Sequence, residues 1–151
     1  MTDSMRIDVE GLKDFRRQLR TAGDGRYSKE LQRINKAAVQ DIASAARRRY
    51  SSHYTSKRGK HVGSIRALAS QRRAQVAIGG PKAPGALGQE FGSNSLPQFK
   101  AWRGSDSKAG YFLWPAIRSG IGQARQEYEA ELDKLLRKAF PNKGIGAGGL
   151  R

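Results

Sequence analysis

The residues of this chain that could do chemistry are mostly cations, and they gather in its middle. Between Asp41 and Glu90 there are ten lysines and arginines and no carboxylate, and the whole chain carries a formal charge of +16 over 151 residues. A polyanion, acidic protein surfaces, or both are therefore the expected partners. The ten cations are Arg47, Arg48, Arg49, Lys57, Arg58, Lys60, Arg66, Arg72, Arg73 and Lys82.

Neither the histidines nor the carboxylates are arranged for catalysis. His53 and His61 both lie in the basic block, where no acidic neighbour can orient a general base or complete a metal site. Four carboxylates near the C-terminal end alternate along a predicted helix, so they point in different directions and form a solvated face. They are Glu127, Glu129, Glu131 and Asp133. We expect no enzymatic activity, no cofactor and no metal; a nuclease would need carboxylates clustered in space, and lost cleavage in a Glu90→Gln variant would reveal it.

Length and composition predict one soluble domain. A chain of 151 residues can bury a single core, although only 37% of its residues are apolar, so that core should be modest. The absence of cysteine excludes disulfides and thiolate sites and fits a reducing compartment. We find no secretory signal and no apolar run of about 18 residues, and we expect a cytoplasmically made protein with no membrane association.

The elements that must position these residues follow from hydrophobic periodicity. Alternation of apolar and polar residues predicts strands over 5–9 and 73–78. Helical spacing predicts helices over 12–22, from the candidate N-cap Ser28 to Ala45, and over 115–140, the last about 39 Å long. We expect an α+β fold in which a small antiparallel or mixed sheet packs against two or three helices, the longest of them C-terminal.

The remaining segments carry weaker signals. A short helical turn is expected over 64–70 and further short strands over 89–92 and 99–103. Residues 51–63 lack any period and are rich in serine, glycine and cations, which predicts an exposed, mobile basic loop. The single domain should span 1–141, followed by a flexible tail over 142–151.

The stretch Glu90-Phe91-Gly92 has a physical interpretation of its own. The glycine permits a positive φ at a turn, and Phe91 is expected to fill the core beneath the sheet. Glu90 is the only acid between Asp41 and Asp106, so we expect it to pair with an arginine of its own or of a neighbouring subunit.

A second stretch leads into the long helix with the sequence Tyr111-Phe112-Leu113-Trp114-Pro115-Ala116-Ile117. The proline suits a first-turn position, and the residue before a proline avoids the helical region. We therefore expect Trp114 to be extended and to form a sharp corner from strand to helix. Phe91, Trp102, Phe112 and Trp114 are interpreted chiefly as core, with contacts to partners as the alternative.

Together these stretches resemble the minor tail component family of long-tailed lambdoid-type bacteriophages, also described as neck or tail-completion proteins. Members carry a Thr-Gly-x-Leu-x-x-Ser-Ile-like segment, a Glu-Phe-Gly-Thr turn and a Pro-Phe-x-x-Pro-Ala helix start, in an order that this chain follows from about Val9 to Phe140. Here Arg58 to Arg66 keeps the glycine and Ser-Ile but lacks the threonine and leucine. Ser93 replaces the threonine after Gly92, and Tyr111-Phe112 replaces Pro-Phe.

The resemblance implies a structural virion protein that forms a ring at the head–tail junction, in the neck at the top of the tail, after assembly in the host cytoplasm. It implies a homo-oligomer of six or a multiple of six, bound to head-completion or connector proteins and to tail-tube or tail-terminator proteins. The residues expected at subunit contacts, or as residues of the family's motifs, are then Glu90, Phe91, Gly92, Phe112, Trp114 and Pro115. Arg47, Arg48, Arg49, Lys57, Arg58, Lys60 and Arg66 are expected to face genomic DNA in the lumen or an acidic partner surface.

Two other interpretations remain open at the level of sequence. The basic residues also fit an ordinary solvated face, or a small nucleic-acid-binding protein without a virion role. That second protein would need a recognition element, and neither zinc-finger spacing nor a pattern of aromatic and basic residues typical of RNA binding is present.

Overall fold

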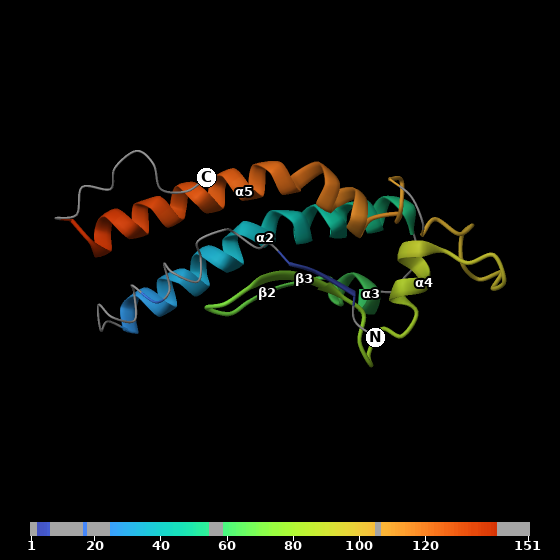
Figure 1. The fold of residues 1–151 in the computed structure, drawn as a ribbon. Helices are drawn as coiled ribbons and strands as arrows, with labels where there is room; N and C mark the ends of the chain where they lie inside the picture. Colours follow the sequence, from blue (N-terminus) through green and yellow to red (C-terminus); the bar gives the residue numbers. More distant parts are fainter. Residues whose placement is uncertain (1–2, 7–16, 18–24, 55–58, 105–106, 142–151) are drawn as a thin grey trace.

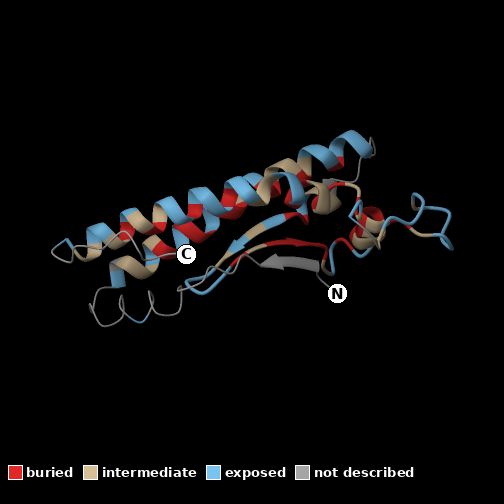
Figure 2. Cartoon of the chain, turned by 45° about the horizontal axis from the view of Figure 1, so that its top comes forward, coloured by how far each residue is buried: buried red, intermediate tan, exposed pale blue. Residues whose placement is uncertain are grey.

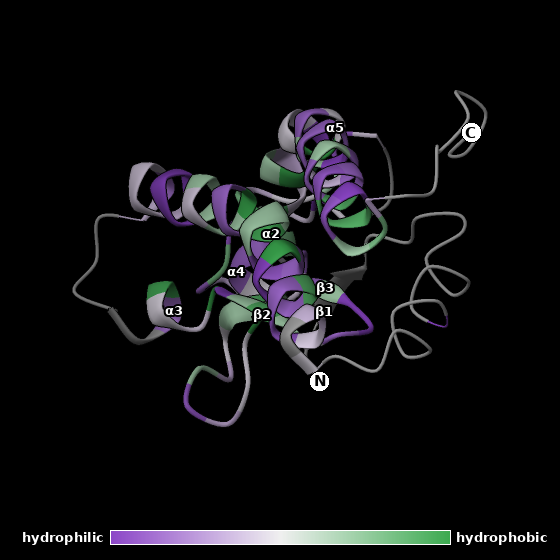
Figure 3. Ribbon diagram, turned by 90° about the vertical axis from the view of Figure 1, so that its left-hand side faces the viewer, coloured by the Kyte–Doolittle hydropathy of each residue, from purple (hydrophilic) through white to green (hydrophobic). Residues whose placement is uncertain are grey.

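The structure is a computed structural model that describes residues 3–6, 17, 25–54, 59–104 and 107–141. It consists of three layers, in which the helix α2 lies between a small sheet and the helix α5 (Figure 1). Figure 3 looks along the helices and shows the same order of layers. The expected α+β fold with a long C-terminal helix is confirmed.

The helix α2, Gly25–His53, is the central layer and is about 43 Å long. Leu31, Ile34, Ala38 and Ile42 recur along it at intervals of three and four, and all are buried. The helix predicted from Ser28 to Ala45 is therefore confirmed, and it is longer at both ends; Ser28 is not its N-cap, because the helix already begins at Gly25. In particular, residues 51–53, expected in the basic loop, complete its last turn.

The sheet has three antiparallel strands in the order β1-β3-β2. They are β1 Asp3–Arg6, β2 Arg66–Ala69 and β3 Ala74–Ile78. The central strand places Val76 between Met5 of β1 and Ala67 of β2, and Val76 and Ile78 are fully buried. Both β2 and β3 pack against α2. The predicted strand over 73–78 and the antiparallel pairing are confirmed, whereas the helical turn predicted over 64–70 is wrong because most of it forms β2.

The helix α5, Leu113–Ala139, packs along the other side of α2, and Figure 2 shows the buried residues of the two helices facing each other. Small residues allow this close approach: a Cβ added at Gly120 would lie 3.1 Å from the Ile42 side chain. Between the first half of α2 and the second half of α5, the two helices form a separate apolar cluster. It consists of Leu31, Ile34, Ala38, Tyr128, Leu132 and Leu135. The predicted helix over 115–140 is confirmed, with its start two residues earlier.

Two short helices lie where the sequence predicted a loop and a strand. Residues 59–63, expected in a loop, form α3, Gly59–Gly63. Residues 89–92, expected as a strand, belong to α4, Ala86–Phe91, and its C-cap. The apolar run there is too short to separate strand from helix by period, but the burial of Ala86, Gln89 and Glu90 has helical spacing. The strand predicted over 99–103 is also wrong, because these residues form an irregular loop.

Several expectations fall on residues outside the described part of the chain. Of the strand predicted over 5–9, only 5 and 6 are described, and both lie in β1. Of the helix over 12–22, only the helical Arg17 is described. Residues 55–58 of the predicted loop and the tail 142–151 lie outside it altogether.

Candidate functional site

The two stretches singled out in the sequence meet at the start of α5. The Glu90 side chain is fully buried, and its two carboxylate oxygens accept hydrogen bonds from three consecutive backbone N–H groups. Oε2 accepts from Phe112 at 3.1 Å and from Leu113 at 2.9 Å, and Oε1 accepts from Trp114 at 2.8 Å. We call this arrangement the Glu90 corner.

The Glu90 corner accounts for the backbone donors that begin α5. The first four N–H groups of a helix have no partner within it. Here Phe112 is the N-cap, Glu90 binds the N–H groups of Phe112, Leu113 and Trp114, and Pro115 has no N–H to satisfy. The first intrahelical bond then runs from Ala116 N–H to Phe112 C=O at 3.2 Å. A negative charge at this end also favours the helix dipole.

Two glycines allow close approaches at this site, one to the carboxylate and one to the backbone of the following loop. Gly110 has φ +80°, and a Cβ there would fall 2.1 Å from Glu90 Oε1. Gly92 has φ +75°, and a Cβ there would fall 2.2 Å from the Ala101 carbonyl oxygen. The positive φ expected at Gly92 is confirmed, although it ends the helix α4 and does not serve a hairpin.

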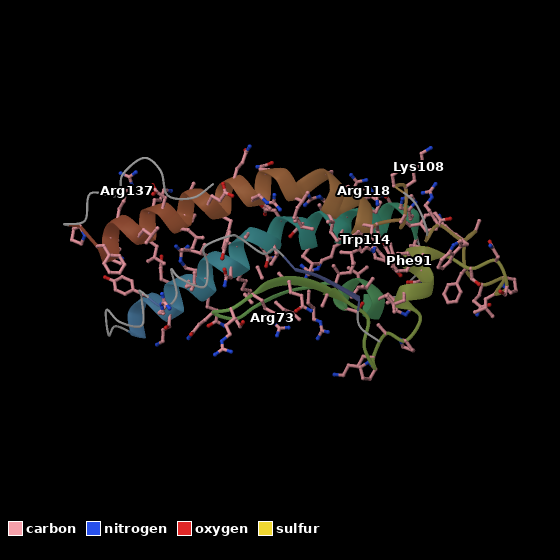
Figure 4. The ribbon with its side chains drawn as sticks, in the orientation of Figure 1. Arg73, Phe91, Lys108, Trp114, Arg118 and Arg137 are labelled. Carbon is pink, nitrogen blue, oxygen red and sulfur yellow. The ribbon has the colours of Figure 1, made fainter. Side chains whose placement is uncertain are left out.

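The aromatic residues of the two stretches have different roles. Phe112 is fully buried in the main core, and Trp114 packs against that core. Trp114 is already helical, so the extended conformation expected for it is wrong; the Glu90 contacts start the helix before the proline. Phe91 does not fill the core beneath the sheet but lies half-buried against Trp102, which is 50% exposed. Figure 4 shows Phe91 and Trp114 at the same end of the molecule.

The loop 93–104, which links the two stretches, is folded back on α4 and held by its own hydrogen bonds. Ser93 N–H donates to Lys100 C=O at 2.8 Å, and Arg103 N–H donates to Phe91 C=O at 2.6 Å. The Phe99 ring covers Gly88, where a Cβ would lie 2.6 Å from the ring. The loop therefore presents its side chains from a fixed backbone.

This loop holds two cations on a group of aromatic rings. Lys100 Nζ lies 5.2 Å from the ring centre of Tyr54 and 5.5 Å from that of Tyr111, and the Arg103 guanidinium lies 4.7 Å from the Tyr111 ring. The His53 ring packs edge-on against Tyr111 with 5.8 Å between ring centres. We call His53, Tyr54, Lys100, Arg103 and Tyr111 the tyrosine–cation cluster.

Hydrogen bonds fix the rings of this cluster. The Tyr111 hydroxyl donates to Ala101 C=O at 2.7 Å, and its backbone N–H donates to Glu90 C=O at 2.9 Å. The Tyr54 hydroxyl donates to Gln89 C=O at 2.6 Å. Burial, together with the neighbouring Tyr111, Tyr50 and Glu90, raises the pKa of Tyr54 to about 12, so its hydroxyl stays protonated. The Glu90 corner and the cluster therefore share one scaffold.

The cluster is strongly positive. Burial lowers the pKa of the His53 imidazole, and the charges of Lys100, Arg103 and Arg49 lower it further. In the described part of the chain, no ion pair joins Arg49, Lys100 or Arg103 to a carboxylate. Sequence reasoning missed Lys100 and Arg103 because both follow the acid-free block; the signal was the alternation of aromatic and basic residues over Phe99-Lys100-Ala101-Trp102-Arg103.

The structure separates the three consecutive arginines of α2. The Arg47 guanidinium donates twice to Ile65 C=O, at 2.9 and 2.6 Å, and so ties α2 to the start of β2. Arg48 lines a groove of about 180 Å³ between α2 and α5, shared with Asp41 and Glu127. Only Arg49 is close enough to the tyrosine–cation cluster to influence His53. Consecutive helix residues point about 100° apart, so these arginines do not form one face.

The other predicted basic residues lie elsewhere. Arg66 is exposed on β2 and lines a hollow of about 840 Å³ next to the turn 79–83. Lys57 and Arg58 lie outside the described residues, as does the side chain of Lys60. A DNA- or partner-facing role for these residues stays a prediction.

Searches among protein-family models, curated proteins and solved structures found no match to this chain. Among the described helices, none combines the length and the apolar character needed to cross a membrane. The described side chains also include no group of three or more histidines, cysteines or carboxylates positioned to hold a metal ion.

Proposed function

We propose that this chain is a structural virion protein that forms a ring at the bacteriophage head–tail junction and links the tail tube to the head connector. The Glu90 corner is the observation that carries the proposal. The two stretches behind the resemblance to the minor tail component family are about twenty residues apart, yet one carboxylate joins them. That contact gives a physical reason why a Glu-Phe-Gly turn and a proline-containing helix start belong together.

The surface of the molecule supports assembly with copies of itself and with other proteins. Among the described residues, three large apolar side chains are exposed, Leu68, Leu96 and Trp102, at 40%, 48% and 50%. Two of them lie on the loop 93–104, which projects at the end of the molecule near α4 (Figure 1). Apolar side chains on a projecting, fixed loop are suited to a subunit contact. Head-completion or connector proteins and tail-tube or tail-terminator proteins are the expected further partners.

The position of Glu90 supports a structural and not a catalytic role. Its oxygens are engaged by the backbone of α5, and a buried carboxylate used in this way cannot approach a substrate. If the chain were a nuclease, a Glu90→Gln variant that remained folded would lose cleavage activity. We expect no cleavage of DNA by the wild-type protein under any divalent-metal condition.

The second candidate is a small basic nucleic-acid-binding protein without a virion role. The tyrosine–cation cluster favours it, because aromatic rings and cations that no described carboxylate pairs with suit a phosphate backbone. The two candidates differ in assembly, since the first requires a closed ring and the second acts as a monomer or dimer.

Native mass spectrometry of the purified chain distinguishes these candidates. The ring proposal predicts a species of six or a multiple of six copies, alone or with a connector or tail-tube protein, and a ring in negative-stain images. A protein that stays monomeric in every mixture and still binds duplex DNA tightly would contradict it and favour the second candidate.

A further inference from the structure

The strongest unassigned feature of the molecule is the positive surface of the tyrosine–cation cluster. Its charges come from segments far apart in the chain: Arg49 from the end of α2, next to His53, and Lys100 and Arg103 from the loop 93–104. Arg49, Lys100 and Arg103 are all exposed. The fold therefore brings like charges together at a surface that solvent and partners can reach.

Bringing these cations together costs electrostatic free energy, and no carboxylate among the described residues offsets that cost. Lys100 and Arg103 are stabilised by the aromatic rings beneath them, but the mutual repulsion remains. The pKa of His53 is lowered first by burial and then by the charges of Lys100, Arg103 and Arg49, which shows that these cations lie close enough to act on one imidazole. A bound anion would relieve it.

The arrangement favours phosphate groups over an acidic peptide. A guanidinium that stacks on a tyrosine still has N–H groups along its edge, and these match the oxygens of a phosphate as well as those of a carboxylate, so the choice between them rests on Trp102. Trp102 lies between Lys100 and Arg103 in sequence and is half exposed, so it offers a face on which a base can stack. The chain's charge of +16 attracts any nucleic acid, and the cluster supplies fixed contacts.

We propose that the tyrosine–cation cluster binds the phosphodiester backbone of nucleic acid, with Lys100 and Arg103 contacting phosphates and Trp102 stacking on bases that are unpaired. This site deepens the proposed function, and its setting beside genomic DNA in a ring rests on that function. The contacts themselves do not require a ring.

Fluorescence anisotropy with a labelled 20-nucleotide single strand and a 20-base-pair duplex tests the site. Two variants remove the same charge: K100Q/R103Q in the cluster, and R72Q/R73Q on the turn between β2 and β3, where Figure 4 places Arg73 away from the cluster. Each phosphate contact contributes about 0.9 to the slope of log affinity against log salt. K100Q/R103Q should therefore lower the slope by about two and weaken binding by about 30-fold at 0.15 M salt. R72Q/R73Q should weaken it less than about threefold, since diffuse charge contributes little.

Further variants distinguish a loss of charge from a loss of folding, and binding to a single strand from binding to a duplex. K100R/R103K keeps both charges and should bind nearly as the wild type does. W102L should weaken binding to the single strand by about tenfold and leave binding to the duplex unchanged, since only unpaired bases can stack. Thermal unfolding of each variant confirms that the comparison is made between folded proteins.

Several results would overturn the site. Equal weakening by K100Q/R103Q and R72Q/R73Q would mean diffuse attraction only. Competition by a polyglutamate peptide at the same charge concentration would assign the surface to an acidic protein. Native masses measured on the same samples distinguish the two proposals. Rings whose DNA binding does not depend on the cluster would contradict this site alone. A protein that stays monomeric but binds through the cluster would contradict the ring alone.

Discussion

Glu90 contributes to stability because its buried carboxylate accepts the hydrogen bonds of the backbone N–H groups that begin α5. A Glu90→Ala change would leave the N–H groups of Phe112, Leu113 and Trp114 without their acceptor. From the strength of hydrogen bonds to a charged group and the favourable helix dipole, we expect a loss of roughly 2 to 4 kcal/mol in the free energy of unfolding. Urea denaturation followed by circular dichroism measures it.

The control for this prediction is Glu129→Gln, which neutralises an exposed carboxylate on α5. It should change the free energy of unfolding by less than about 0.5 kcal/mol. If Glu90→Ala proved as mild as this control, the Glu90 corner would not be the anchor of α5.

His53 provides a pH prediction. Because burial and the nearby cations lower its pKa, its imidazole should titrate below the usual value of 6.5 in an NMR pH titration. In K100Q/R103Q two of the repelling charges are absent, so its pKa should rise, while burial keeps it below 6.5. An unchanged pKa in that variant would mean that the two cations do not influence the imidazole.

The same shift predicts the sign of a stability change. An imidazole whose pKa is lower in the folded protein binds fewer protons than in the unfolded chain. The contribution of His53 is therefore fully present above about pH 6.5 and is lost as the pH falls toward its folded pKa. A His53→Gln variant should lose less stability than the wild type between pH 7.5 and pH 5, as measured by urea denaturation.

At the level of single residues, the sequence identified the right carboxylate but not its partner. Glu90 was singled out because no other acid lies near it in the chain, and an arginine was the obvious expectation. Its observed partners are backbone N–H groups 22 to 24 residues away. Such a contact cannot be predicted from the types of the side chains. An arginine contact with a neighbouring subunit stays a prediction. Lys100 and Arg103 were missed because they come close to Tyr111 only in the folded protein and not along the sequence.

Among the elements, α2 and α5 depend on small residues for their close packing. Gly120 faces Ile42, and a Cβ there would lie 3.1 Å from that side chain, whereas a Cβ at Gly122 would meet nothing within 4 Å. Gly122→Ala should stabilise the protein by about 0.5 to 1 kcal/mol, because alanine is the better helix former. Thermal or urea denaturation measures the gain.

Gly120→Ala is the matched test, since it has the same helix propensity gain but a crowded site. It should gain less than Gly122→Ala, or lose stability, as Ile42 must shift. Equal gains at both positions would show that the interface between α2 and α5 is looser than this packing indicates.

Long elements with a clear period were predictable, and short ones were not. The helices α2 and α5 each repeat their apolar spacing over many turns, and β3 alternates because one face packs on α2. The strand β2 has only four residues and alternates exposed with half-buried positions, so Leu68 and the preceding Ile65 suggested a helical turn. The helix α4 spans six residues, and its helical state depends on burying Glu90 against α5.

On the scale of the whole molecule, charge is distributed unevenly, and we therefore expect its two ends to differ in whether they attract a polyanion. Where α2 and α5 extend beyond the sheet, acids pair with bases, as in Arg33 with Glu30 at 2.7 Å and Arg137 with Asp133 at 2.8 Å. At the opposite end, Figure 4 shows Lys108 and Arg118 near Trp114, and the tyrosine–cation cluster lies beside the Glu90 corner. We expect the end with the cluster to attract a polyanion and the balanced end not to attract one.

The measurement that tests the virion role most directly is electron microscopy of phage particles assembled without this chain. If it joins head to tail as part of a ring, the preparation should contain filled heads without tails, together with unattached tails, and supplying the wild-type chain should restore whole particles. Complete and infectious particles formed in its absence would contradict that role.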